Sequence, residues 1–338
     1  MTNDKAQNPN KSLNDKSRSK YQVVLFGFGI LSIYLIFVIW ILSFNSFAID
    51  TGQAGLDIAV LKAGVGARPL GMGSAFTAVA DNSDAPYWNP AGLSRIKQNE
   101  LSAMQTKLST DADQYYISYA QPFLAGGIGI SWIQIGMSSI TQTTGTTDAY
   151  NEVQTLGIFS FFSNAYIIAY GQDINDRLSF GVNAKYLTSD MPGLVSIEGA
   201  SAWGYSVTPG LIYRVSDRLT IGLKVDELVN MQKWGTDAEE KAPSKTRLGL
   251  AYRTDAFGLP LLLAGDASQI NKAGYLPEGS AGMELTAGAL AFRLGYADTA
   301  LTAGAGFTQD HVSIDYAYVS QTALTMENVH RVSLTGRW

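Results

Sequence analysis

The sequence contains no cysteine, and its only histidines are His311 and His330. Without cysteine there is no disulfide framework, no thiolate metal site and no cysteine nucleophile. Charged residues make up 16% of the 338 residues, against roughly 25% in ordinary soluble domains. Such a chain lacks the basic surface of a nucleic-acid-binding protein, while its 46% of hydrophobic residues excludes a disordered chain. We therefore predict a protein that is not an enzyme, needs no cofactor or metal and binds no nucleic acid.

A long apolar run occurs once, near the N-terminus. Residues 1–20 are polar and rich in lysine, residues 23–44 carry no charge, and Ser46-Phe47-Ala48 offers small residues at both positions that a signal peptidase reads. This order predicts a secretory signal peptide over residues 1–48, cleaved after Ala48. The competing interpretation is a retained anchor, because the apolar run is long enough to span a bilayer of about 30 Å.

From residue 99 onward, apolar and polar residues alternate along the chain. In residues 219–226, for example, apolar side chains occupy one set of alternate positions, and polar side chains or glycine occupy the other. A period of two indicates strands with one apolar and one polar face. Fourteen segments follow this pattern, with the weakest alternation in the third and fourth: 99–108, 113–123, 126–137, 163–174, 177–188, 203–215, 218–226, 245–253, 258–267, 279–287, 289–296, 300–308, 311–319 and 328–338.

The connections between these segments alternate between short and long. The longest are predicted loops over residues 138–162 and 227–244. Tight turns at one end and long loops at the other are typical of a transmembrane barrel. The fold class is therefore predicted to be all-β: a barrel of about 14 antiparallel strands over residues 99–338, with both of its ends on the periplasmic side.

Alternation alone does not say which face of the strands meets lipid. A soluble β-sandwich or small soluble barrel also alternates, but it turns its apolar face inward. The export signal, the terminal aromatic residue Trp338, and polar faces rich in glycine, serine and threonine favour a lipid-facing apolar surface. We expect an integral protein of the bacterial outer membrane, with the lipid of that membrane as its surroundings.

Residues 49–98 precede the first strand and contain the most specific motifs. Residues 74–80 are small and able to form a short helix, and Asn89-Pro90 is a signal for a turn or a helix start. A compact, partly helical insert before a barrel suggests a plug. The motif residues are Gly71, Gly73, Asn89, Pro90 and Ala91.

This stretch resembles the N-terminal region of the PorV/PorQ family, within the FadL-like (long-chain fatty acid transporter-like) group of outer-membrane barrels. The resemblance implies a fourteen-stranded barrel whose N-terminal hatch lies in the lumen. Pro69 after Arg68 and Pro86 before Tyr87 depart mildly from the family pattern, as does the unusually long signal region.

The resemblance implies two classes of function. In the first, the barrel passively takes up or binds hydrophobic small molecules such as fatty acids or aromatic hydrocarbons. In the alternative, it is a type IX secretion accessory or shuttle that binds secretion-system proteins. A barrel enzyme needs a histidine placed toward the cell exterior, whereas His311 falls in a predicted periplasmic turn and His330 fits a solvated or girdle position.

The polar faces carry more basic than acidic side chains. Part of this excess is expected to hold the hatch through its acidic residues, for example Asp81 with Arg214, and part to meet an acidic headgroup; ordinary solvated lumen charges are the equal alternative. The candidate lumen charges are Asp81, Asp84, Arg214, Lys224, Arg253 and Arg293. Because glycine weakens a strand, a kink in the wall is expected at Gly126, Gly127 and Gly129.

Overall fold

The computed structural model describes residues 59–108, 112–147, 150, 152–194, 200–297, 300–320 and 328–338. All of them belong to one compact unit, Ser46–Trp338. The signal peptide predicted over residues 1–48, and residues 49–58 of the predicted hatch, lie outside the described residues. Within these ranges, every helix is too short or too polar to cross a membrane.

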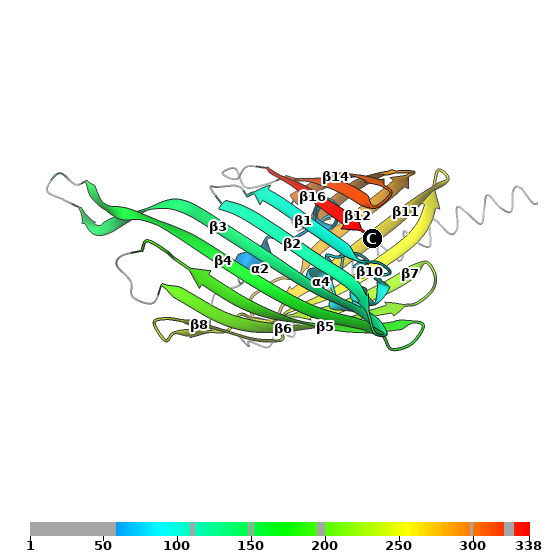
Figure 1. The fold of residues 1–338 in the computed structure, drawn as a ribbon, viewed down its shortest axis with the longest axis horizontal. Helices are drawn as coiled ribbons and strands as arrows, with labels where there is room; N and C mark the ends of the chain where they lie inside the picture. The colour runs from blue at the N-terminus through cyan, green and yellow to red at the C-terminus, as the bar shows by residue number, and fades with distance from the viewer. Residues whose placement is uncertain are drawn as a thin grey trace, which may run out of the picture. The chain divides into compact units, whose positions relative to one another are not determined.

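Antiparallel strands dominate the fold (Figure 1). Their bounds are β1 Glu100–Lys107, β2 Ala112–Phe123, β3 Gly126–Thr147, β4 Val153–Asp173, β5 Leu178–Asp190, β6 Ser201–Arg214, β7 Leu219–Asp226, β8 Val229–Trp234, β9 Glu239–Glu240, β10 Lys245–Ala256, β11 Leu259–Ile270, β12 Glu278–Ala287, β13 Leu290–Ala297, β14 Ala300–Gln309, β15 Val312–Val319 and β16 Val329–Arg337. Consecutive strands pair from β1 to β7 and from β10 to β16, β7 pairs with β10, and β1 pairs with β16, so fourteen strands close a barrel.

The barrel confirms the fold class and all fourteen predicted segments, but two predicted loops were wrong. Most of residues 138–162 extends β3 and β4, which project as a hairpin beyond β2 and β5 (Figure 1). The stretch 227–244 contains β8 and β9, and β8 pairs with β6. In the projecting hairpin both faces meet solvent, so no buried face imposes alternation, although its many threonines favour strands.

The two faces of the barrel wall differ in polarity. Inward side chains of β7 such as Thr220 and Lys224 are buried, whereas the outward Leu223 is 37% exposed. The same alternation runs through β16, where Arg331 and Ser333 are buried and Leu334 is 53% exposed. The polar faces therefore line the lumen and the apolar faces point outward, the reverse of a small soluble barrel.

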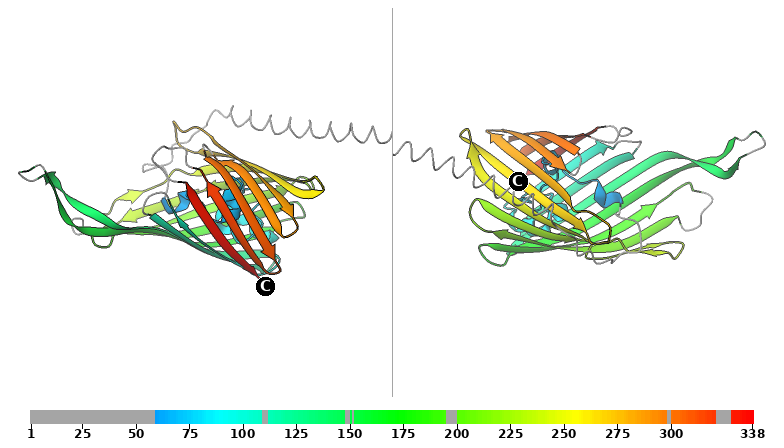
Figure 2. Two further views of the ribbon diagram at one scale, coloured as in Figure 1. Left: turned by 90° about the horizontal axis from the view of Figure 1, so that it is seen from above. Right: turned by 180° about the vertical axis from the view of Figure 1, so that it is seen from behind.

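The connections β2–β3, β4–β5, β6–β7, β10–β11, β12–β13 and β14–β15 are all short and lie at one end of the barrel, together with its C-terminus (Figure 2). Asn99 and Trp338 exchange two backbone hydrogen bonds with N–O distances of 3.0 and 3.1 Å. The Arg337 amide donates to the carbonyl of His311 in the turn between β14 and β15 at 2.7 Å. The even strand number thus brings both ends of the barrel to the short-turn side, as the sequence predicted.

The first described residues fold inside the barrel as short helices, α2 Ala59–Lys62, α3 Ala67–Gly71, α4 Ala85–Trp88 and the 3-10 helix η1 Pro90–Arg95. Proline begins η1 because its missing N–H needs no partner there. The Asn89 side chain accepts a hydrogen bond from the Ala91 amide and caps this helix. Phe76, Trp88 and Leu93 are almost fully buried, so this N-terminal segment, residues 59–96, supplies much of the hydrophobic core.

Candidate functional site

Inward-facing glycines line much of the lumen where the N-terminal segment touches the wall. A Cβ atom at Gly222 of β7 would overlap the backbone of Thr77, and one at Gly282 of β12 would overlap that of Met72. Gly171 of β4 makes the same close approach to the backbone at Pro90. We call this set the glycine belt: Gly127, Gly129, Gly171, Gly181, Gly210, Gly222, Gly249, Gly282 and Gly295. It lets the segment lie against the wall at backbone distance.

Polar side chains of the wall also hold the segment, for example on β16, β1 and β2. Ser333 Oγ accepts a hydrogen bond from the Ala67 amide at 2.8 Å, and Glu100 Oε2 accepts one from the Ser83 amide at 2.9 Å. The wall therefore holds the segment in two ways: glycines allow close backbone packing, and side-chain hydrogen bonds satisfy backbone groups of the segment, on these strands and also on β11, where Asp266 accepts from the Phe76 and Thr77 amides.

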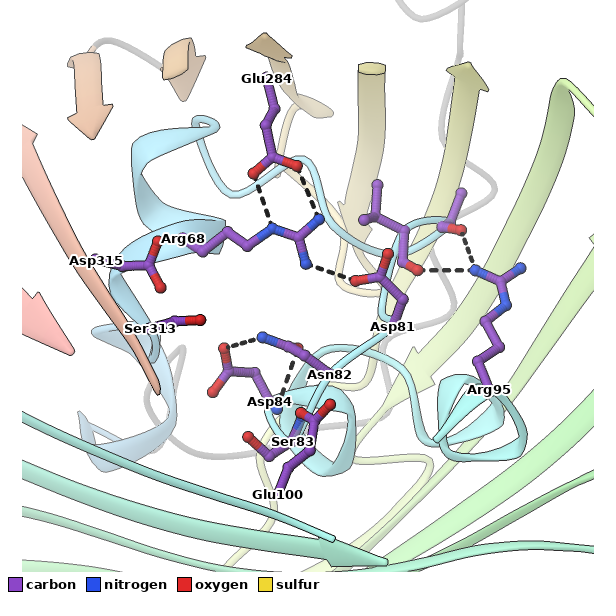
Figure 3. A network of polar contacts seen from close by, with 12 residues as sticks. Arg68, Asp81, Asn82, Ser83, Asp84, Arg95, Glu100, Glu284, Ser313 and Asp315 are labelled. Atoms are coloured by element: carbon purple, nitrogen blue, oxygen red, sulfur yellow. Dashed lines mark hydrogen bonds and ion pairs between the residues drawn. The ribbon is translucent and has the colours of Figure 1, made fainter. Parts of the chain in front are cut away.

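Arg68 of α3 is the centre of a charged network between the segment and the wall (Figure 3). Its Nε and Nη2 donate to the two carboxylate oxygens of Glu284 on β12 at 2.8 and 2.9 Å, and its Nη1 donates to Asp81 at 2.6 Å. Glu284 also pairs with Arg293 of β13 at 2.6 Å. Burial lowers the pKa of Arg68, but the carboxylates of Asp81 and Glu284 outweigh it and hold this pKa above its ordinary value.

Asp84 lies near charges of its own sign, whereas Arg68 lies near charges of the opposite sign. Its carboxylate is buried and accepts hydrogen bonds from Asn82 Nδ2 at 2.9 Å and the Tyr116 hydroxyl at 3.1 Å. The charges that act on it come from Asp315 and Glu100, both acidic. Burial raises the pKa of Asp84 to about 6, and these two carboxylates add to the rise.

The predicted lumen charges are only partly brought together. Asp81 pairs with Arg68 and, at 3.5 Å, with Arg253. Arg214 lies exposed at the end of β6, so the expected pair of Asp81 with Arg214 is replaced by these two arginines. Lys224 meets the segment through the Tyr87 carbonyl, to which its Nζ donates at 3.0 Å.

The motif residues all lie in the segment. A Cβ atom at Gly71 would lie 3.2 Å from the Cα atom of Gly304 on β14. Gly73 has a φ of 63°, a conformation that glycine adopts without strain. Asn89 Nδ2 donates to the carbonyls of Thr77 and Leu211, tying the start of η1 to another turn of the segment and to β6. Pro90 and Ala91 lie against the belt at Gly181.

Gly126, Gly127 and Gly129 lie in β3, where its register with both β2 and β4 is continuous. Gly127 and Gly129 face the segment at Leu93 and Pro86. The register shifts of β3 occur farther along, beyond Met137. A kink at these three glycines stays a prediction.

A cavity of about 250 Å³ lies between the segment and the wall, toward the long-loop end. Leu61, Leu70 and Trp88 of the segment give it an apolar side. The wall gives it a charged side of paired ions: Lys185 with Glu227, Lys224 with Asp226 at 2.9 Å, and Lys245 with Glu278 at 2.6 Å. The cavity can accept a small molecule that has both an apolar and a polar part.

Sequence reasoning did not identify Arg68, Glu227 or Glu278 as site residues. The alternation along its strand places Glu284 on the polar face. Its partner Arg68, however, lies 216 residues away in the sequence. Glu227 follows a strand, where alternation carries no information. Arg68 is the one charged residue in the small and apolar stretch 63–76, and that isolation was the signal available in the sequence, since a charge that a fold encloses needs a partner.

Solved structures with the same fold include transporters of hydrophobic molecules. The toluene transporter TodX of P. putida matches with a TM-score of 0.58 and 14% identity, over 81% of this chain and 99% of that chain. The toluene transporter TbuX of Ralstonia pickettii matches with a TM-score of 0.56 and 14% identity, over 83% and 100%. The monoaromatic hydrocarbon channel CymD gives 0.56 and 13%, over 81% and 98%.

No protein-family profile matches the chain, and no curated protein matches it. At these identities, the likeness to the solved structures concerns the fold alone. The chain therefore has the closed fourteen-stranded, FadL-like barrel fold that these transporters share.

Proposed function

We propose that the chain is an integral outer-membrane barrel for passive uptake of hydrophobic small molecules. One observation carries the proposal: a closed barrel with an apolar outer face has the fold of toluene transporters, and its lumen holds the chain's own N-terminal segment. The protein is not an enzyme in this proposal. Residues 1–48 direct export and are removed after Ala48, which leaves the segment to enter the barrel.

The N-terminal segment is the described part of the proposed hatch, which spans residues 49–98. Its fit to the glycine belt and the Arg68–Glu284 pair support this role, because they fix the segment within a lumen that would otherwise conduct water. The cavity of about 250 Å³ between the segment and the wall is the proposed entry site. Its apolar side at Leu70 and Trp88 would receive the hydrocarbon part of the ligand.

A second candidate function is that of a type IX secretion accessory, as the PorV/PorQ resemblance implies. The projecting part of the β3–β4 hairpin favours it, because that ribbon reaches beyond the neighbouring strands and exposes apolar side chains such as Leu156 and Ile158. In that case secretion-system proteins would bind at the hairpin, and the barrel would transport nothing.

The proposal is tested by uptake in whole cells, because hydrocarbons cross a plain lipid bilayer without help. A strain that lacks the gene is complemented with the wild-type chain, with Ala242→Trp, which fills the cavity, or with Leu276→Ala, a control in an exposed loop. We expect the wild type and the control to restore uptake of radiolabelled toluene at micromolar concentration, and Ala242→Trp to restore little. Equal uptake with and without the gene, together with mislocalised surface proteins, would favour the secretion accessory.

A further inference from the structure

The wall of the cavity between the segment and the barrel carries an excess of positive charge. The ion pairs of Lys185 and of Lys245 each match one cation with one carboxylate. Asp226 differs, because its two oxygens pair with Lys224 Nζ at 2.9 Å and with Arg247 Nε at 3.1 Å. Among the described wall residues that line the cavity, one positive charge is therefore left without a carboxylate.

Arg247 of β10 has donors that no described residue uses. Its Nε donates to Asp226, but within the described part of the chain neither Nη1 nor Nη2 has a hydrogen-bond partner. The Arg247 side chain is 20% exposed and lines the cavity. The strand register places it between Lys224 of β7 and Ser268 of β11, which line the same cavity. The free edge of its guanidinium therefore offers two parallel donors to a planar acceptor such as a carboxylate.

The segment side of the cavity is aromatic and apolar. Tyr87 and Trp88 line it, and their rings meet edge to face with centroids 5.1 Å apart. Leu61 and Leu70 complete this side. Aromatic rings bury a large apolar area and pair well with a further ring. The cavity thus combines an aromatic side with an arginine that can bind a carboxylate.

The volume and the charge of the cavity limit the ligand. At about 250 Å³ the cavity is smaller than the roughly 300–1,000 Å³ of sites for drug-sized ligands. A single aromatic ring with one charged substituent is compact enough for such a space. The excess of one positive charge favours one negative charge on the ligand, because a second carboxylate would meet cations that are already paired.

We propose that the cavity selects a singly charged aromatic carboxylate, which Arg247 holds. The ring of the ligand lies against Trp88 and Tyr87, and its carboxylate oxygens accept hydrogen bonds from Nη1 and Nη2 of Arg247. Charged hydrogen bonds of this bidentate kind are stronger than neutral ones and fix the orientation of the ligand. The inference rests on the proposed function, because it uses the same cavity, and it names a ligand class: aromatic acids in preference to neutral molecules of the same shape.

Isothermal titration calorimetry of the chain, purified in an uncharged detergent at neutral pH, tests the proposal. The two ligands are 4-methylbenzoate, which is ionised, and 4-methylbenzamide, a neutral molecule of nearly the same shape. We expect the wild type to bind one molecule of the acid per chain, about tenfold more tightly than the amide, because the amide forms no charged pair of hydrogen bonds with Arg247.

Variants of Arg247 show whether this side chain is the cause. Arg247→Gln should weaken binding of the acid about tenfold and leave binding of the amide nearly unchanged. Asp226 keeps Lys224 as its partner in this variant. Arg247→Lys keeps the charge but loses the parallel donors, so we expect an intermediate affinity. Arg218→Gln is the matched control, because Arg218 lies exposed in the turn between β6 and β7, and it should bind the acid as the wild type does.

Thermal melting shows that each variant is folded. No binding of the acid by the wild type, equal affinity for the acid and the amide, unchanged binding of the acid by Arg247→Gln, or an equal loss in Arg218→Gln would each overturn the inference. The comparison of the two ligands needs no variant, so it decides the matter even where Arg247→Gln fails to fold. Toluene uptake without preferential binding of the acid overturns this inference alone, whereas binding of the acid without any uptake overturns the proposed function alone.

Discussion

Arg68 and Asp84 are two charged residues of the N-terminal segment that the lumen treats differently. Arg68 has two carboxylate partners, and one of them, Glu284, lies on the barrel wall. Asp84 has hydrogen-bond donors around its carboxylate but acidic residues as its charged neighbours. Arg68 therefore binds the segment to the wall, while the raised pKa of Asp84 predicts that the stability of the folded chain depends on pH.

Truncation of Arg68 should weaken the hold of the segment strongly. Arg68→Ala removes the bidentate partner of Glu284 and one partner of Asp81, while Arg293 and Arg253 remain beside these carboxylates. We therefore expect the loss of charged hydrogen bonds to cost about 1.5–3 kcal/mol of unfolding free energy. Thermal melting in detergent measures the loss. In the double variant with Glu284→Ala the two costs should not add, because both substitutions remove the same Arg68–Glu284 pair. Simple additivity would contradict a direct coupling.

Because the pKa of Asp84 is raised, we expect the unfolding free energy of the chain to fall as the pH rises from about 4 to about 6. Its pKa is raised from 3.8 to about 6 in the folded chain, so in this window the folded state binds more protons than the unfolded state. Ionisation then costs about 3 kcal/mol above pH 6. Asp84→Asn should remove this slope, whereas Asp176→Asn in an exposed turn should keep it. Parallel pH profiles of the melting temperature in the wild type and Asp84→Asn would exclude the mechanism.

At the scale of the elements, the glycine belt explains why a chain with 34 glycines forms regular strands. Glycine usually weakens a strand. In this barrel the inward glycines on successive strands give room to the backbone of the segment, as at Gly222 and Gly282. The strands and the segment therefore depend on each other for their packing.

Adding one methyl group to the belt should dislodge the segment. Gly222→Ala places a Cβ against the Thr77 backbone, which cannot move aside as a flexible side chain can, so we expect a cost of about 1–3 kcal/mol. Limited proteolysis should cut the segment faster in this variant. Gly157→Ala is the matched control, because nothing lies within 4 Å of its new methyl group. Equal cleavage of both variants would show that the belt does not position the segment.

The strands were predictable because each one has a lipid face and a lumen face. The alternation around Lys224 and Leu223 shows both faces within two residues. The projecting half of β3–β4 was missed because Ile158 and its neighbours lie beyond the barrel wall and have no apolar environment on either side to enforce a pattern. The charged network was predictable only in part. The alternation along β12 shows that Glu284 points inward, but it does not show that Arg68 pairs with it.

At the scale of the whole molecule, the side chains face lipid on the outside and water or the segment on the inside. Outward residues from strands around the barrel are exposed and apolar, among them Ile130, Ile168, Leu294 and Leu301. A soluble protein rarely shows so continuous an apolar surface. We therefore expect this fold to be stable when the hydrocarbon of a membrane or detergent covers that surface.

An arginine on this outer face should therefore impair membrane assembly. Leu223→Arg places a charge outward near the middle of β7, where the cost in a bilayer is about 2–4 kcal/mol. Leu276→Arg is the control, because Leu276 lies 84% exposed in a long loop. Outer-membrane fractions of cells that express each variant measure the assembled protein, and we expect a large decrease for Leu223→Arg alone. If the chain without its signal peptide instead stays monomeric in buffer without detergent, its apolar face cannot be a lipid-facing surface.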